Sequence, residues 1–464
     1  MNRLNGTLVL FIAALMYNEF IQETLRLPSF LRPLDMLIVV WILHTLKRGV
    51  HLPTLTLTRS IQGIVILFLM LTCLVPLLGL SLQAYTISEL LGGVLPSLRT
   101  VLYAFSFWLF YHSSMKGLIR YKDLVTAYVW VSLPHFMYGL MQFIAINTPW
   151  IDYSVLPWQP VRVRGNGETE IMNYVVTGLT EAPFSIATWG STSAIICFVL
   201  LMKFPKKMRK QAQEGLSHVL SSIPSSAVQW MGLITGLGMV VMSMRRTTLL
   251  ALLVGMVAAL GIKVLLSQKQ RWSGTGVFWK TLIVATLLLT LGAMYSPSIE
   301  QRVTSMISLA QGDVNDPSLR NLHGRSEETW GYWIDFFFQN PYGIGLYPPE
   351  IMKVSSDNTY LTYLAQGGLV YSLGYMALLV VLTWFSLYLF RNHEELLSAY
   401  GLSLFGVMVI IWVSGIGTGG SMASLVWAYR WAFLGCLCAE YMQAAAPQTS
   451  NMSFLRPRSF ITNS

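Results

Sequence analysis

The stretch TTLLALLVGMVAALGIKVLL, from Thr247 to Leu266, decides the fold, because it is apolar along its length and Lys263 is its only charged residue. A helix needs about 20 such residues to cross the hydrocarbon core of a bilayer. The sequence holds roughly twelve windows of this kind. They lie near residues 6–24, 33–47, 61–80, 99–115, 122–146, 182–203, 226–244, 247–266, 276–296, 359–390, 398–417 and 422–442. We therefore expect an all-α integral membrane protein, a bundle of about 12 transmembrane helices.

The amino-acid composition indicates the same class. Of the 464 residues, 54% are hydrophobic and 11% are charged, whereas a soluble domain carries about 25% charged residues. The net charge of +10 does not indicate nucleic-acid binding, because the basic residues fall in short clusters between the apolar windows. The four cysteines lack the spacing of a metal or redox site, and we expect them in the core. They are Cys73, Cys197, Cys436 and Cys438.

The basic clusters also predict how the chain crosses the membrane. Most of them lie in four loops that share one side of a twelve-span arrangement, at residues 47–59, 116–122, 203–210 and 263–271. Loops rich in lysine and arginine stay in the cytoplasm, so this side and both termini are predicted to be cytoplasmic. The opposite, extracytoplasmic face then carries residues 81–98, 147–181, 245–246 and 297–358.

This arrangement divides the chain into four regions. Residues 1–296 are predicted to form transmembrane helices 1–9 with short loops, and residues 359–442 to form helices 10–12. Between them, residues 297–358 form an extracytoplasmic loop that is too polar to enter a bilayer. Residues 443–464 have the composition of a disordered cytoplasmic tail. We expect a ligand-binding or catalytic surface in the polar loop.

The middle of this loop has the pattern of an amphipathic helix. Ser326 can cap a helix whose first turn holds Glu327 and Glu328. Asn340-Pro341 ends the pattern, so we expect a short helix with short amphipathic neighbours on the membrane surface. Arg325, at its start, either anchors the helix to anionic lipid or binds an anionic substrate. Apolar residues recur at helical spacing along it: Trp330, Trp333, Ile334 and Phe337.

Two further motifs follow this helix. Pro341-Tyr342-Gly343-Ile344-Gly345 is a tight turn in which the glycines permit close approach of the backbone. Asp357-Asn358 then opens the apolar window that begins Thr359-Tyr360-Leu361. Asp357 is either the N-cap of that helix or a general base at the mouth of a membrane span.

These loop motifs resemble those of the O-antigen ligase and polymerase family. Its hallmark is an arginine before a tryptophan-bearing helix, then P-x-G-x-G, then His-Asn-x-x-Leu at the start of a span. GRSEETWGYWIDFFFQNPYGIG, from Gly324 to Gly345, matches the first part. Asp357-Asn358-Thr359-Tyr360-Leu361, followed by Gln366-Gly367-Gly368-Leu369, matches the second, with Asp357 where the family has its histidine.

Two weaker likenesses extend this resemblance. Arg245-Arg246 forms a hairpin between two spans, where the family has an arginine, and this pair either binds pyrophosphate or caps the preceding helix. Residues 162–183, which end Gly178-Leu179-Thr180-Glu181-Ala182-Pro183, resemble the family's G-x-x-x-E/N-P signature. Glu181 is either a second candidate base or an ordinary helix start.

The resemblance implies a glycosyltransferase-like enzyme of the bacterial inner membrane that acts outside the cytoplasm. Its substrate would be a glycan carried on undecaprenyl pyrophosphate, and it would need no nucleotide sugar, metal or other cofactor. Membrane lipid, a chain-length regulator and a flippase are the further partners implied, and nucleic acid is not. Asp357 in place of histidine favours a polymerase of glycan repeat units over a ligase that transfers glycan to lipid A-core. The alternative of another class is a lipid-linked glycan flippase or transporter.

The family likeness and the charges together predict a set of site residues. The predicted catalytic residues are Asp357, Glu181 and Arg325. The predicted substrate-binding residues are Arg245, Arg246, Arg164, Arg320, His323, Asn358 and Tyr360. A transporter should carry charges along the bundle interior, whereas these gather on one outer loop and one hairpin. Four ionisable residues within the spans are scattered, and we expect them near interfaces or bonded to neighbours. They are His44, His135, Lys280 and Arg430.

Overall fold

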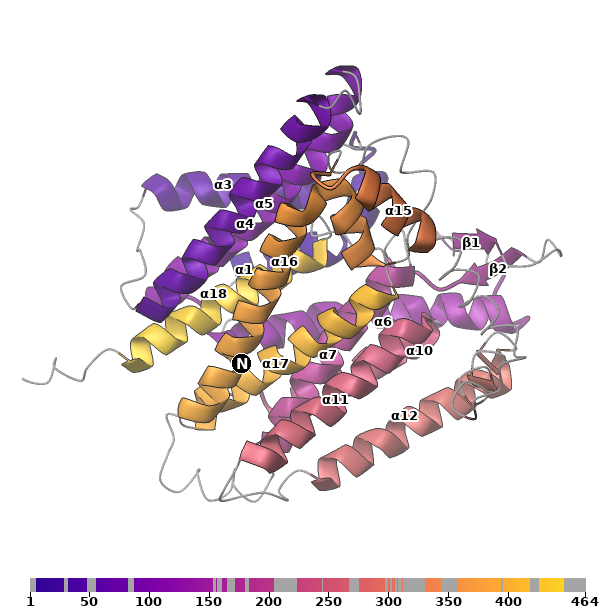
Figure 1. Cartoon of the computed structure of the whole chain (residues 1–464). Helices are drawn as coiled ribbons and strands as arrows, with labels where there is room; N and C mark the ends of the chain where they lie inside the picture. The colour runs from indigo at the N-terminus through magenta and orange to yellow at the C-terminus, as the bar shows by residue number, and fades with distance from the viewer. Residues whose placement is uncertain are drawn as a thin grey trace, which may run out of the picture.

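The computed structural model describes a helical bundle (Figure 1). The described residues are 6–28, 32–47, 56–81, 87–152, 156, 161–164, 172–179, 183–203, 223–243, 245–266, 275–296, 299–300, 303–304, 307, 311, 330–343, 358–393, 395–417 and 425–445. Their elements are α1 (Gly6–Met16), α2 (Asn18–Thr24), α3 (Pro33–Lys47), α4 (Thr56–Ser81), α5 (Ile87–Met115), α6 (Tyr121–Asn147), β1 (Val161–Arg164), β2 (Met172–Val175), α7 (Pro183–Lys203), α10 (Ser226–Met242), α11 (Arg246–Leu266), α12 (Thr275–Tyr295), α15 (Gly331–Gln339), α16 (Thr359–Asn392), α17 (Glu395–Ile416) and α18 (Leu425–Ala445).

Within the described ranges, eight helices are long and apolar enough to cross a membrane. They belong to α4, α5, α6, α7, α11, α12, α16 and α17. The apolar segments of α3 and α10 are shorter. The chain is thus a multi-pass α-helical protein, as the apolar windows predict. The count of twelve spans stays a prediction, as does the side of the membrane on which each loop lies.

The first predicted span, residues 6–24, is wrong as a single helix. The chain bends at Tyr17, between α1 and α2. α1 has 11 residues, which at about 1.5 Å per residue covers only about half of a hydrocarbon core. The Asn18 side chain accepts a hydrogen bond from the Leu34 N–H at the start of α3 (3.2 Å). The bend therefore places a polar side chain where it satisfies the end of the next helix.

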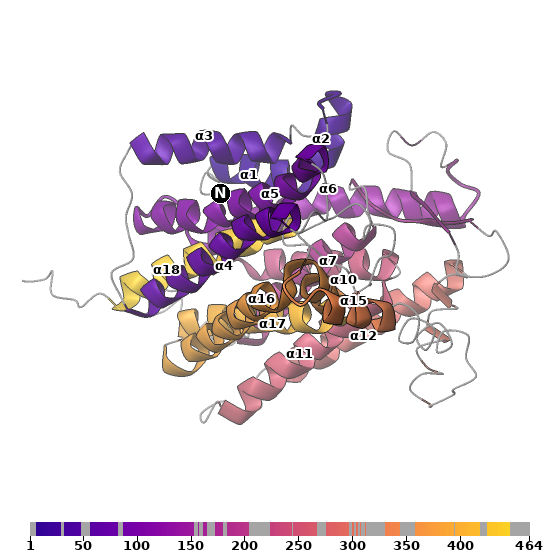
Figure 2. The same cartoon turned by 45° about the horizontal axis from the view of Figure 1, so that its top comes forward.

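α7 forms the centre of the bundle, since 94% of its apolar segment is buried, whereas the corresponding fraction for α12 is 11%. α7 packs closely on α10 through two glycines. A Cβ at Gly190 would lie 2.6 Å from the Gly236 carbonyl oxygen. Small residues permit such close approach of helices in membranes. Figure 2 shows α3 and α1 on one side of the bundle, and α11 and α12 on the other.

α18 packs along α5. A Cβ at Gly435 would overlap the Phe107 carbonyl, so the two backbones are in contact. The expectation of cysteines in the core is confirmed for Cys197, Cys436 and Cys438 but is wrong for Cys73, which is exposed on α4.

A hairpin of two short strands departs from the all-α prediction. β1 and β2 form an antiparallel hairpin in which Val161 pairs with Val175 and Arg164 pairs with Met172. The alternating sequence Val-Arg-Val-Arg has the two-residue period of a strand. Each strand has only 4 residues, which is far shorter than a window of transmembrane length.

Candidate functional site

The predicted site residues divide into two groups. Asp357, Glu181, Arg325, Arg320 and His323 lie outside the described residues. The structure describes the others: Arg164, Arg245, Arg246, Asn358 and Tyr360. Arg164 is the last residue of β1, where its backbone pairs with Met172.

α16 begins at Thr359, two residues after the predicted base, and its cap is Asn358 rather than Asp357. The Asn358 Oδ1 accepts hydrogen bonds from the backbone N–H groups of Tyr360 (3.0 Å) and Leu361 (3.2 Å). These are donors that the first turn of a helix leaves unsatisfied. The alternative that Asp357 is the N-cap is therefore wrong, and its role as a general base stays a prediction.

α16 is broken one residue before Leu369, within the Gln-Gly-Gly-Leu motif. Gly368 has φ 72° and ψ −177°, a combination that is nearly restricted to glycine. The break frees backbone groups that a continuous helix would satisfy. One of them finds a partner in the turn after α15, because the Leu369 N–H donates to the Pro341 carbonyl (3.0 Å).

The Pro-Tyr-Gly turn docks on this break by direct contact between backbones. Gly343 also has a positive φ, 78°, and a Cβ there would lie 2.5 Å from the Gln366 carbonyl oxygen. A Cβ at Gly368 would in turn overlap the backbone of Tyr342. Two motifs that are separate in the sequence thus form one joint, in which each needs a glycine.

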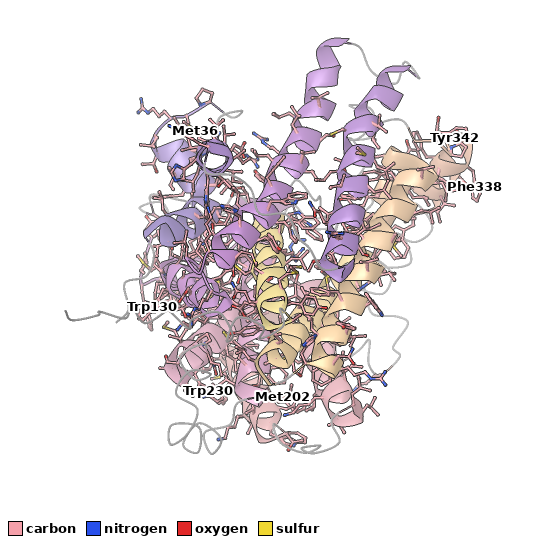
Figure 3. All side chains as sticks on the ribbon, turned by 90° about the vertical axis from the view of Figure 1, so that its left-hand side faces the viewer. Met36, Trp130, Met202, Trp230, Phe338 and Tyr342 are labelled. Atoms are coloured by element: carbon pink, nitrogen blue, oxygen red, sulfur yellow. The ribbon has the colours of Figure 1, made fainter. Side chains whose placement is uncertain are left out.

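α15 fits against the first part of α16 (Figure 1). Trp333 is 2% exposed and packs with Ala365, Phe336 and Leu361. The helix ends at Asn340, as predicted. Figure 3 shows Phe338 and Tyr342 at the outer edge of the molecule, where they are 73% and 75% exposed. The helix is therefore amphipathic, with one aromatic side chain buried and others free to contact a membrane surface.

This joint bears on the segment that contains Asp357. The chain is held at Gly343 against the break in α16, and again at Asn358 by the cap of the same helix. Gly343 and Asn358, which flank residues 344–357 in the sequence, are thus both held on α16.

Tyr360 has a packing role that the sequence did not indicate. Its hydroxyl donates to the Trp412 carbonyl of α17 (2.8 Å), and its ring stacks on the Trp412 ring with centroids 6.2 Å apart. A Cβ at Gly415 would lie 3.0 Å from the Tyr360 ring. Tyr360 therefore joins the start of α16 to the end of α17, and a contact with substrate stays a prediction.

Arg245 and Arg246 lie at the tip between α10 and α11. Arg246 is the first residue of α11, and Arg245 is exposed. The Ser243 hydroxyl donates to the Val240 carbonyl near the end of α10 (2.6 Å). This serine therefore gives one of the last carbonyl groups of that helix a hydrogen-bond partner. Both arginines lie at the N-terminus of α11, which is the positive end of its dipole. Cations are disfavoured at that end, whereas anions are favoured. Binding of pyrophosphate by these arginines stays a prediction, as does the alternative that they cap the preceding helix.

The end of α17 connects this tip with the start of α16. A Cβ at Gly417 would overlap the side chain of Thr247, the residue after the arginine pair. Gly415, two residues earlier, contacts Tyr360. The structure thus brings the predicted residues Arg245, Arg246, Asn358 and Tyr360 to one end of the bundle, although over 100 residues of sequence separate the two motifs.

The segment before Glu181 is held by two residues of α6 that the sequence analysis did not assign to the site. The Gln142 Oε1 accepts from the backbone N–H groups of Thr177 (3.1 Å) and Gly178 (2.8 Å), and its Nε2 donates to the Gly178 carbonyl (3.1 Å). The His135 Nδ1 accepts from the Leu179 N–H (3.1 Å). The one feature of the sequence that distinguishes Gln142 is its polar amide within an apolar window, where polar side chains are rare.

Gly178 is required where it contacts His135. Its φ is 64°, and a Cβ there would lie 2.6 Å from the His135 Cε1. Since the Nδ1 accepts a hydrogen bond, the neutral imidazole carries its proton on Nε2. That nitrogen is buried and has no hydrogen-bond partner among the described residues. The glycine of the G-x-x-x-E/N-P likeness therefore has a structural reason, which is to let the chain pass over an imidazole just before Glu181.

The chain matches no model of a known protein family and no curated protein.

Proposed function

We propose that this protein is a polymerase that joins glycan repeat units carried on undecaprenyl pyrophosphate, in the making of an O-antigen, capsule or exopolysaccharide. The observation that carries the proposal is the shared location of two motifs. The arginine tip and the start of α16 lie at one end of the bundle, connected through Thr247, Gly417, Gly415 and Tyr360. One motif is cationic, and the other directly follows a carboxylate.

The chemistry assigned to these residues is an inverting transfer of glycan. Asp357 removes the proton from the acceptor hydroxyl, and the resulting oxygen nucleophile attacks the anomeric carbon of the donor. The bond from that carbon to the phosphate oxygen breaks, and undecaprenyl pyrophosphate leaves with the bonding electron pair. Arg325, Arg245 and Arg246 hold the pyrophosphate and stabilise the charge that develops on it. Glu181 is the second candidate for the base.

The remaining predicted residues would bind the glycan or its carrier. Arg164, Arg320 and His323 supply donors to phosphate or sugar oxygens. The side-chain oxygen of Asn358 holds the start of α16, and we assign this residue and Tyr360 to the edge of the glycan site. This proposal places the site on the extracytoplasmic face of the inner membrane, with both chain termini in the cytoplasm.

The test of function is a reaction with purified components. The full chain in lipid nanodiscs is incubated with a lipid-linked repeat unit, and the products are separated by size. A polymerase makes a ladder of longer lipid-linked glycans. Transfer to lipid A-core with no ladder would identify a ligase, and transport of an unaltered glycan between leaflets would identify a flippase.

The test of sidedness uses single cysteines in a chain whose four native cysteines are replaced. A cysteine near Gly312 is expected to react with an impermeant maleimide added to intact cells, whereas one near Arg209 is not. Labelling at the Arg209 position without cell lysis would contradict the predicted arrangement of spans.

A further inference from the structure

α16 folds back on itself at the break at Gly368. In a straight helix, Tyr360 and Tyr375 would lie about 22 Å apart along the axis. Their ring centres are only 6.3 Å apart, and those of Tyr363 and Tyr375 are 4.8 Å apart. Residues 359–367 therefore lie alongside the part of α16 that follows the break, and do not extend it.

The part of α16 after the break has the length of one membrane span. From Leu369 to Arg391 the helix rises about 33 Å, close to the hydrocarbon core of about 30 Å. All 34 residues of α16 in one line would rise about 51 Å. Arg391 is exposed at the far end, where an arginine can extend its charge to the membrane surface. The span therefore runs from the break to Arg391.

The exposure of side chains on α16 also changes at the break. None of residues 359–368, all of which the structure describes, is exposed. Leu369 and Val370, directly after the break, are 49% and 62% exposed. Further exposed apolar residues follow in the same part of the helix: Leu373, Val380 and Trp384. In a multi-pass protein such side chains face lipid tails, so the lipid-facing surface of α16 begins at the break.

Two exposed aromatic side chains lie at the level of the break. The turn after α15 is fixed there by the hydrogen bond from the Leu369 N–H to the Pro341 carbonyl (3.0 Å). Phe338 and Tyr342, on either side of this proline, lie at the outer edge of the molecule (Figure 3). Tyrosine is enriched where lipid headgroups meet the tails. Phenylalanine is typical of the apolar face of a helix that lies in the membrane surface.

We propose that the joint between α15 and α16 lies in the interface of the phospholipid bilayer, with Phe338 and Tyr342 inserted among the lipid headgroups. Residues 369–391 cross the membrane from this level. Residues 359–367 return from it into the bundle. The two aromatic side chains and the first exposed residues after the break form one continuous surface, whose partner is lipid.

The start of α16 then lies below the level of the headgroups. Tyr375, whose ring is close to that of Tyr360, follows Leu369 by six residues, which is about 9 Å of helix. Asn358, which caps the helix, is 7% exposed. The cap is therefore enclosed by the bundle at the depth of the lipid tails. This inference concerns depth in the bilayer and does not depend on the proposed polymerase activity.

Electron paramagnetic resonance of single nitroxide labels tests the proposal. The full chain, with its four native cysteines replaced, carries one label at a time in nanodiscs of phosphatidylcholine and phosphatidylglycerol. Collision with oxygen increases with depth in the bilayer, whereas collision with a water-soluble nickel chelate decreases. Labels at Tyr342 and Val370 are expected at the level of the headgroups, and a label at Val380 about 15 Å deeper than Val370. A label at Leu287, exposed in the middle of α12, calibrates the centre of the bilayer.

Three results of these measurements would overturn the proposal. Collisions of the nickel chelate with the Tyr342 label at the rate seen in water would place the joint outside the membrane. Equal depths of the labels at Val370 and Val380 would centre the membrane on the middle of α16. Shielding of the Tyr342 label from both reagents would show that protein, such as a second copy of the chain, covers this surface.

Removal of the two aromatic side chains tests their role as anchors. In Phe338→Gln combined with Tyr342→Gln, a label at Asp335, exposed on α15, should collide with the nickel chelate severalfold more often, because α15 no longer inserts. The matched control Tyr295→Gln removes an exposed tyrosine at the end of α12 and should leave this collision rate unchanged. Equal rates in the double variant and the unaltered chain would refute the anchoring role.

Discussion

Substitution of Gly368 by alanine tests whether the joint between α15 and α16 is needed. The backbone at this position has φ 72° and ψ −177°, and an L-residue held in such a region costs about 1–3 kcal/mol. The new Cβ would also overlap the backbone of Tyr342, so the turn must move and the bond from Leu369 N–H to Pro341 is lost. A hydrogen bond contributes about 1 kcal/mol. The joint should thus weaken by about 2–4 kcal/mol.

Hydrogen exchange measures this loss directly. The Leu369 amide and the amides of α15 are expected to exchange on the order of 10²-fold faster in Gly368→Ala, since each 1.4 kcal/mol is a factor of ten. Helices far from the joint, such as α5, should keep their protection. In the polymerase assay the variant should accumulate single lipid-linked repeats, because Gly343, 14 residues before Asp357, is no longer held against the break in α16.

A matched glycine separates this effect from a general effect of alanine. Gly261 lies within α11, and nothing would contact a Cβ there within 4 Å. Gly261→Ala should be neutral or stabilise the protein by up to about 1 kcal/mol, because alanine is the better helix former. If exchange at Leu369 were equal in the two variants and in the unaltered chain, the reasoning about the joint would be refuted.

Five further variants test the site. Asp357→Asn should lower the rate of polymer formation by about 10²-fold or more with Tm unchanged, because Asn358 already caps the helix; normal polymer from this variant would remove the base assignment. Two changes remove the bidentate phosphate contacts: Arg325→Lys, and Arg245→Ala combined with Arg246→Ala. Each variant should make less polymer although it is expressed at the normal level. Normal amounts of polymer from both variants would leave these arginines only a structural role. Gln142→Leu removes the acceptor of two buried backbone N–H groups and should cost about 1–3 kcal/mol, seen as a lower Tm, whereas Gln142→Glu keeps an acceptor and should lose less.

Local sequence patterns were sufficient for features that depend on near neighbours in the chain. Asn340-Pro341 ends α15 as predicted, because proline cannot continue a helix. The start of α16 was placed correctly at Thr359. Asp357 was considered as its cap, whereas the cap is Asn358. Both are good capping residues, and only the geometry of the chain decides which side chain faces the free N–H groups.

Features that depend on distant contacts could not be predicted. At the break at Gly368, the Leu369 N–H is bonded to the Pro341 carbonyl of a distant turn. After the bend at Tyr17, Asn18 is bonded to the start of α3. Glycine alone does not predict a break, since Gly261 lies in an unbroken helix. Arg430 was expected at an interface because an isolated arginine in an apolar window most often snorkels. The structure instead places its guanidinium carbon 4.8 Å from the centre of the Trp427 ring, one turn earlier in α18.

The apolar windows determined that this chain is a helical membrane protein, and the tertiary structure alone decided which helices form its centre. The apolar segments of α7 and α12 have nearly the same mean hydropathy, 1.7 and 1.8, yet 94% of one and 11% of the other is buried. In water, exposure to solvent would penalise the apolar face of a helix and so reveal which side faces inward. In a bilayer, lipid tails and a protein interior are equally apolar, so packing between helices makes the distinction instead.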